Sequence, residues 1–200
     1  MPYGRLIEST MAQVQKHRKS GLINGFAARI LLKKILPSQR MLLLIVSCLK
    51  LYKMTGVRWL GRKSHMLKLL SRRLASLEES TPQINGNRFK ANDRVILPEG
   101  NLRAKVALLS GCIMPLVNGP EMEAMVRVLV RNGCEVVVPR NQGCCGAINS
   151  HVGDLDTARM LARKNVDIFL GLDIDTLVVG SAGCGSRMKE YGDLLRHDTL

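Results

Sequence analysis

The sequence predicts an α/β protein in which a basic α-helical N-terminal region is followed by a parallel βαβαβα unit. Three short apolar runs, residues 105–110, 135–138 and 176–179, are typical of buried strands, and helical patterns separate them. Each run leads into a turn with glycine and then cysteine. Charge separates the two halves of the chain: residues 1–100 carry 19 Lys and Arg against 5 Asp and Glu, whereas residues 101–200 carry 11 of each.

Residues 1–78 are expected to form a basic helical region. Apolar residues recur at helical spacing from Leu6 to Val14, and further helices are expected over residues 25–36, 39–54 and 64–77. Ser38 is the expected N-cap of the third helix. That helix is apolar nearly all round at its start, which predicts burial. Residues 79–103 are rich in turn-forming residues and are expected to be a linker, so that the second domain covers residues 104–200.

The acid-free stretch from Thr10 to Leu77 allows three interpretations. The basic residues can form solvated faces, which would also suit an acidic partner protein, or they can contact an anionic membrane surface. Nucleic acid is not expected, because the aromatic residues here are scattered and no binding motif is present. The N-terminus has no secretory signal, and the longest apolar run, residues 41–49, is too short to span a bilayer. A cytoplasmic location is therefore expected, with peripheral contact at the inner face of the membrane as an option.

The second half has the helices that a parallel sheet needs. Pro120 is expected to begin a helix that ends before Gly133, and Asp154 is expected to cap a long helix that ends near Leu170. A final helix is expected around Met188 and Tyr191.

Four cysteines, Cys112, Cys144, Cys145 and Cys184, lie just beyond the three predicted strands. Ligands of such sheets bind beyond the carboxyl ends of the strands, so three loops could bring four thiols together. Four cysteine thiolates are the ligand set of an iron–sulphur cluster. Adjacent glycines are expected to allow positive φ and to leave backbone N–H groups free to face sulphur. These are Gly111, Gly143, Gly146, Gly183 and Gly185.

The alternatives at these positions are buried packing cysteines and zinc. Packing would explain one cysteine but not four at one strand end, and the paired knuckles usual for structural zinc are absent from the sequence. Cys134 precedes its strand and is expected at the opposite edge, while Cys48 is expected to pack within the third helix. His151 could be a ligand or proton donor, but a surface histidine is favoured.

The phrases around these cysteines resemble the cysteine-rich CCG domain of heterodisulfide reductases and of lactate, glycerol-3-phosphate and glycolate oxidising systems. Residues 110–112, 143–147 and 181–185 carry the likeness. Residues 135–140, 153–159 and 162–165 make the glycolate oxidase iron–sulphur subunit the most similar family, and residues 3–8 resemble the segment after that family's ferredoxin-type motifs. The chain departs from the family in three ways: it lacks those ferredoxin motifs, it has one CCG module, and Arg187 stands where many members have a final cysteine. It therefore resembles part of a longer protein.

The resemblance implies an electron-transfer subunit of a glycolate or other 2-hydroxy-acid oxidase, inactive alone. It would pass electrons from flavin-containing oxidase subunits toward membrane quinone through an iron–sulphur cluster, expected to be 4Fe-4S. Cys112, Cys144, Cys145 and Cys184 would be the metal ligands, with Gly143 and Gly146 lining the cofactor, and no residue would be catalytic. The alternatives are a thiol–disulfide redox module similar to heterodisulfide reductase and a non-enzymatic binding protein.

Overall fold

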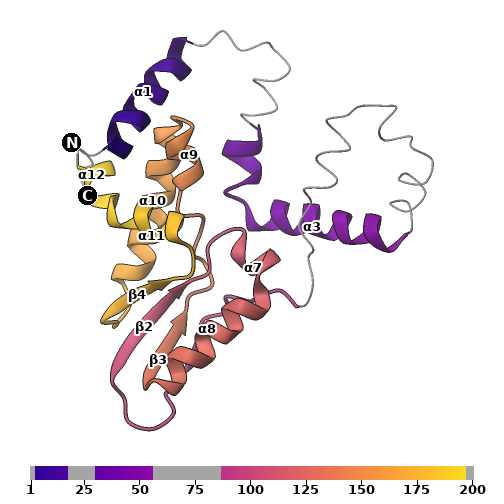
Figure 1. Ribbon diagram of the computed structural model, residues 1–200, viewed down its shortest axis with the longest axis vertical. Coiled ribbons are helices and arrows are strands. Elements are labelled where there is room, and N and C mark those ends of the chain that lie inside the picture. The colour runs from indigo at the N-terminus through magenta and orange to yellow at the C-terminus, as the bar shows by residue number, and fades with distance from the viewer. Residues whose placement is uncertain (1–2, 18–29, 56–86, 197–200) are drawn as a thin grey trace.

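The computed structural model describes residues 3–17, 30–55 and 87–196. Within them, a four-stranded sheet has helices on both faces (Figure 1). The strands are β1 (Arg94–Ile96), β2 (Ala104–Leu109), β3 (Cys134–Val138) and β4 (Thr176–Val179). Their order is β1-β3-β2-β4, and β3, β2 and β4 are parallel. The α/β class and the three parallel strands are confirmed.

Strand β1 lies within the segment expected to be a linker. It pairs antiparallel with β3, Arg94 opposite Val138, and Phe89 just before it is buried in the core. The linker prediction was therefore wrong for this part of residues 79–103, because a three-residue strand has no alternation long enough to recognise. The division of the chain into domains stays a prediction.

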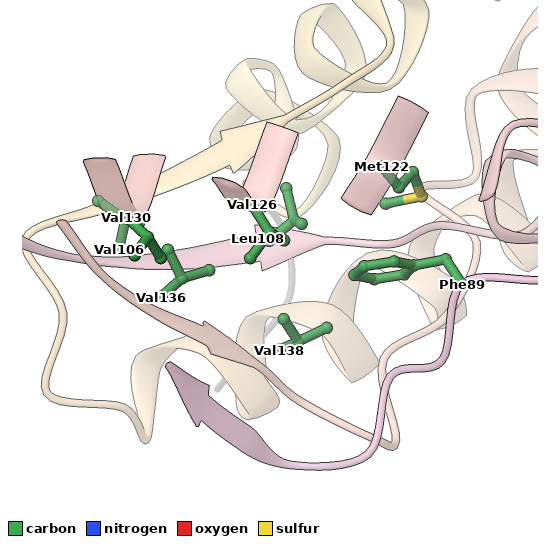
Figure 2. Close-up of a cluster of buried hydrophobic side chains, with 8 residues drawn as sticks. All are labelled: Phe89, Val106, Leu108, Met122, Val126, Val130, Val136 and Val138. Atoms are coloured by element: carbon green, nitrogen blue, oxygen red, sulfur yellow. The ribbon is translucent and has the colours of Figure 1, made fainter. Parts of the chain in front are cut away.

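The first face of the sheet packs against α8 (Gly119–Arg131), whose apolar side chains meet β2 and β3 (Figure 2). The β2 residues in this layer, Val106 and Leu108, alternate with Ala107 and Leu109, which face the opposite layer. The first core cluster consists of Phe89, Val106, Leu108, Met122, Val126, Val130, Val136 and Val138. Since both faces of β2 are covered, its continuous apolar run is explained.

The second face is covered by the helices that follow the cysteines. These are α9 (Ala147–His151), α10 (Leu155–Leu170) and α11 (Ala182–Lys189), and α12 (Tyr191–Leu194) contacts α11. Asp154 caps α10 as expected, its carboxylate accepting the backbone N–H of Thr157 at 3.5 Å. The final helix begins earlier than expected, at Ala182, so Cys184 lies in its first turn.

The N-terminal region supplies α1 (Tyr3–His17), the short π-helical turn η1 (Leu31–Ile35) and α3 (Gln39–Met54). Ser38 caps α3 as predicted: its hydroxyl accepts the N–H of Met41 at 3.4 Å. The expected burial of α3 was wrong, because Leu44 and Leu51 are 60% and 62% exposed, and among the α3 residues whose burial the structure describes only Leu42 is buried. The helix expected over residues 64–77 and most of the helix expected over residues 25–36 lie outside the described residues.

Candidate metal centre

The four predicted ligands converge at the carboxyl edge of the parallel strands. Cys112 follows β2, the Cys144–Cys145 pair follows β3, and Cys184 follows β4. The chain leaves β2 for β3 on one side and reaches β4 on the other, so the end of β2 is the topological switch point of the sheet. Open α/β sheets bind ligands at this point, because the loops diverge there and leave a crevice.

The four thiols form a continuous series of contacts. Cys112 Sγ and Cys144 Sγ lie 3.4 Å apart, and side-chain interactions continue from Cys144 to Cys145 and from Cys145 to Cys184. Cys144 and Cys145 are buried, and Cys112 and Cys184 are half-buried. Within the part of the chain that the structure describes, no three His, Cys, Asp or Glu side chains are arranged to hold a single metal ion. The four thiols therefore interact as successive pairs, Cys112 with Cys144, Cys144 with Cys145 and Cys145 with Cys184.

Crowding of the thiols controls their protonation. The contact with Cys144 lowers the pKa of Cys112, and the contact with Cys112 raises the pKa of Cys144 to about 12. Cys145 also has a raised pKa, chiefly through Cys144, and the contact with Cys145 together with burial raises the pKa of Cys184. A thiolate therefore forms more easily at Cys112 than at the other three thiols, and further negative charge is opposed by its neighbours.

Backbone N–H groups face the sulphur atoms. Gly146 donates its N–H to Cys144 Sγ at 3.5 Å, and the N–H groups of Ile113 and Ala147 interact with Cys112 and Cys145. Such donors favour thiolates and tune a bound metal group. The prediction that glycine N–H groups would face sulphur is confirmed at Gly146.

The predicted positive φ holds at only two of the five glycines. Gly111 has φ +68 and Gly146 has φ +77, whereas Gly143, Gly183 and Gly185 are outside that region, so the expectation was wrong for them. At Gly146 the close approach also matters: a Cβ would lie 3.3 Å from backbone atoms of Ala158 in α10. Gly143 serves differently, donating its N–H to Asn165.

A buried network holds the loop that carries Cys144 and Cys145. Asn165 of α10 accepts the N–H of Gly143 at 3.0 Å and donates to the carbonyl oxygen of Cys144 at 3.0 Å. Tyr191 donates to the carbonyl oxygen of Cys145 at 2.9 Å, and burial raises the pKa of its phenol. Both side chains are buried, and through them α10 and α12 hold the backbone of the loop.

Gln142 ties the ends of β2 and β3 together. Its amide oxygen accepts the N–H of Ser110 at 2.7 Å, and its amide nitrogen donates to the carbonyl oxygens of Leu108 and Pro139. The side chain is 2% exposed, and every contact is made to backbone. Gln142 therefore sets the spacing between the exits toward Cys112 and Cys144.

A cavity of about 230 Å³ opens beside Cys112. It lies between α3, α7 (Met114–Val117) and the segment that includes Phe89, with Arg88 and Lys90 among its lining residues. One wall of the site is therefore reachable from solvent.

Cys134, Cys48 and His151 lie outside the thiol cluster. Cys134 begins β3 at the opposite end of the strand and packs against the first core cluster. Cys48 is exposed on α3, so its expected packing was wrong. His151 ends α9, its side chain is 66% exposed, and it contacts Glu8.

The donor set fits an iron–sulphur cluster in its chemistry. Four thiols surround the switch point, and the groups that shift their pKa values are other thiols, Ser181, backbone N–H groups and burial. Four thiolates at one site repel one another, and a bound group with positive charge, such as iron, would offset that repulsion.

Asn165, Tyr191 and Gln142 were not predicted as parts of the site. Asn165 breaks the buried side of α10 with a polar residue, and Gln142 lies directly before the Gly143 turn. A buried amide on an otherwise apolar helix face is the signal that could have identified Asn165 as part of the site.

Two family comparisons match this arrangement. Residues 106–189 match the cysteine-rich domain family named CCG, and residues 23–81 match the linker region of the glycolate oxidase iron–sulphur subunit. No solved structure matches the chain.

Similar curated proteins give the same picture. The chain is 31% identical over 197 residues to the probable glycolate oxidase iron–sulphur subunit of Bacillus subtilis, covering 98% of this chain and 44% of that protein. The glycolate oxidase iron–sulphur subunit of Escherichia coli is 32% identical over 49% of this chain and 25% of its own length. Lactate utilization protein A of Geobacillus thermodenitrificans is 32% identical over 47% of this chain and 38% of its own length.

The fold and the four thiols thus define a cysteine-rich domain of the CCG class. Over almost its whole length, the chain is similar to a glycolate oxidase iron–sulphur subunit. It spans less than half the length of the curated relatives it matches.

Proposed function

We propose that Cys112, Cys144, Cys145 and Cys184 hold an iron–sulphur cluster of the 4Fe-4S type. The observation that carries this proposal is the meeting of four thiols from three strand exits at the switch point of the sheet. A bound cluster of this kind supplies one-electron transfer. Gly143 and Gly146 would line it, Gly146 through its N–H beside Cys144 Sγ.

The chain's own residues would hold the ligands and limit the access of water. Asn165 and Tyr191 fix the backbone of the Cys144–Cys145 loop, and Gln142 fixes its distance from Cys112. Burial of Cys144 and Cys145 keeps one side of the site dry, while the cavity beside Cys112 leaves another side open. Exposure and backbone hydrogen bonds to sulphur are the terms by which a protein sets a cluster's potential.

The role that follows is electron transfer within a glycolate or other 2-hydroxy-acid oxidase. Relatives named as glycolate oxidase iron–sulphur subunits support it. Flavin-containing oxidase subunits would donate electrons, and membrane quinone would be the eventual acceptor. The chain alone would not oxidise glycolate, and none of its residues would be catalytic.

The basic N-terminal helices would place the protein against an anionic membrane surface on the cytoplasmic side. Supporting this, α3 exposes an apolar face beside basic residues, with Leu44 and Leu51 well exposed and Arg40 exposed on the same helix. No helix among the described residues is long and apolar enough to cross a membrane. The contact would therefore be interfacial.

The function is tested by anaerobic reconstitution with iron and sulphide, followed by chemical analysis and electron paramagnetic resonance (EPR). Stoichiometric iron and acid-labile sulphide, with a reducible paramagnetic signal, would support the cluster. Zinc bound in preference, without sulphide, would overturn it. Dye reduction with glycolate is then measured with the chain alone and with a flavin subunit added; turnover by the chain alone would overturn the electron-transfer role.

A further inference from the structure

Glu8 is the one acidic residue in the first 77 positions of the sequence, and its side chain contacts a residue in the second half of the chain. Glu8 of α1 accepts two hydrogen bonds from Nη1 of Arg187, at 2.8 and 2.7 Å. The Arg187 side chain is 5% exposed and that of Glu8 is 12% exposed. Glu190, on the C-terminal side of the same helix, also pairs with Arg187 at 3.1 Å. Glu8 and Arg187 thus form a largely buried pair, and 179 positions separate them in the sequence.

Arg187 lies on the helix that carries a predicted ligand. Cys184 occupies the first turn of α11 and Arg187 the next, three positions later, so both lie on neighbouring parts of one helix face. The N-cap of this helix, Ser181, makes no capping hydrogen bond through its side chain.

The same helix α1 also contacts α9, the helix that follows the Cys144–Cys145 loop. Gly153, in the turn after α9, lies so close to α1 that a Cβ would be 2.7 Å from backbone atoms of Met11 and Ala12. His151 at the end of α9 contacts Glu8 at 3.4 Å. α1 packs beside α9 (Figure 1), which begins directly after Gly146. α1 therefore contacts both α9, which follows the Cys144–Cys145 loop, and α11, which carries Cys184.

The described apolar side chains of α1 bury little surface against the domain. Its large apolar side chains are exposed by 40% or more: Leu6, Ile7, Met11 and Val14. Among the residues that the structure describes, the Glu8–Arg187 pair is a largely buried polar link between α1 and the domain. Removing one partner of such a pair is costly, because the other charge is left buried without compensation.

We propose that Glu8 and Arg187 are positioning residues for the thiol cluster, so that α1 is a structural part of the site. This role rests on the proposed function. In it, α1 holds α11, and therefore Cys184, in position relative to the Cys144–Cys145 loop. Neither residue touches the cluster ligands through a hydrogen bond in the described structure; both act through the helices they join.

The test compares Glu8→Gln and Glu8→Asp with a matched control, Glu123→Gln. Glu123 makes a similar two-oxygen pair with Arg94, at 3.0 Å to each oxygen, but it joins α8 to β1. The first readout is alkylation of Cys184 in the metal-free full chain, followed by mass spectrometry. The second is the rate of iron release to a chelator from the reconstituted protein, together with its EPR line shape.

Glu8→Gln should speed Cys184 alkylation and raise the rate of iron release about 10- to 100-fold, the usual effect of losing a residue that supports metal ligands. It should also change the EPR line shape. Glu8→Asp, which keeps the carboxylate, should recover part of each effect, and Glu123→Gln should match the unmodified protein.

Unchanged alkylation and iron release in Glu8→Gln would overturn the inference, as would equal effects in Glu123→Gln. If Glu8→Gln does not fold, the comparison of Glu8→Asp with Glu123→Gln decides by the same criteria. Failure of the unmodified chain to take up iron would contradict the proposed function, while the alkylation readout would still decide the positioning role.

Discussion

The hydroxyl group of Tyr191 donates a hydrogen bond to the carbonyl oxygen of Cys145 and accepts one from the amide of Asn165, at 2.9 and 3.2 Å. Because Asn165 also binds the carbonyl oxygen of Cys144, the two side chains together hold both adjacent cysteines from the backbone side. The thiol groups are left free of this task, so the loop can be rigid while its sulphur atoms remain available to metal.

Replacing Tyr191 by Phe should lower the free energy of unfolding by about 1–3 kcal/mol, because the buried carbonyl of Cys145 and the amide of Asn165 each lose a partner. Urea unfolding of the metal-free protein measures this. Tyr52→Phe, the same change in α3, is the control and should have little effect. A Tyr191→Phe protein as stable as the unmodified one would show that the network does not hold the loop.

Gly146→Ala should be destabilising by about 1–3 kcal/mol, because the residue has φ +77, which L side chains rarely adopt. The new Cβ would also press on the backbone of Ala158 at 3.3 Å. Gly183→Ala is the matched control, since no atom lies within 4 Å of its Cβ position and it is inside α11. The control should be neutral or stabilising by up to about 1 kcal/mol. Equal thermal shifts in the two variants would contradict this account of Gly146.

The metal-free protein should lose stability as the pH rises above about 8.5, the ordinary thiol value. Cys144, Cys145 and Cys184 have raised pKa values in the fold, so the folded state keeps protons that the unfolded chain releases. Their stabilising contribution is complete below the unfolded pKa and is lost as pH rises toward the folded values. The lowered pKa of Cys112 changes stability in the opposite direction, but this is one group, whereas three groups have raised pKa values.

Urea unfolding between about pH 7 and about pH 10, a range that brackets the ordinary thiol value, measures this dependence. Cys184→Ala should show a shallower decline than the unmodified chain. Identical slopes would mean that folding does not raise the pKa of Cys184.

Binding to anionic vesicles should be seen at low salt and fade as salt rises, because each Lys or Arg near the surface contributes about 1 kcal/mol and is screened over about 10 Å at roughly 0.1 M salt. Lys34→Glu, in the exposed basic turn η1, should weaken it. Arg127→Glu, an equal charge change on α8, should weaken it less. Equal sedimentation with neutral vesicles would exclude an electrostatic contact.

Much of the second half could be predicted from sequence, because its determinants are local. The three parallel strands are apolar runs with clear turns, and thiols after all three had to meet at one edge of the sheet. Strand β1 was not predicted, because Arg94–Ile96 is too short to show the alternation of a strand. The α3 helix was misjudged because an apolar sequence indicates burial only when a partner covers it.

The supporting residues could not be found in the same way. Asn165 and Gln142 act on backbone atoms of other elements, so their roles depend on tertiary placement. The pairing of Glu8 with Arg187 joins the two halves of the chain and leaves no local pattern. In the sequence, Glu8 is visible only as a single acidic residue within the basic N-terminal region.

The most direct test of the central claim is visible absorbance after anaerobic reconstitution of Cys145→Ser beside Cys134→Ser. Both replace one cysteine, but Cys145 belongs to the thiol series at the switch point and Cys134 lies at the opposite end of β3. Serine is a harder and poorer ligand than a thiolate. Iron–thiolate absorbance lost in Cys145→Ser and kept in Cys134→Ser is the predicted result; equal loss in both, or retention in Cys145→Ser, would contradict the assignment of the cluster to this edge of the sheet.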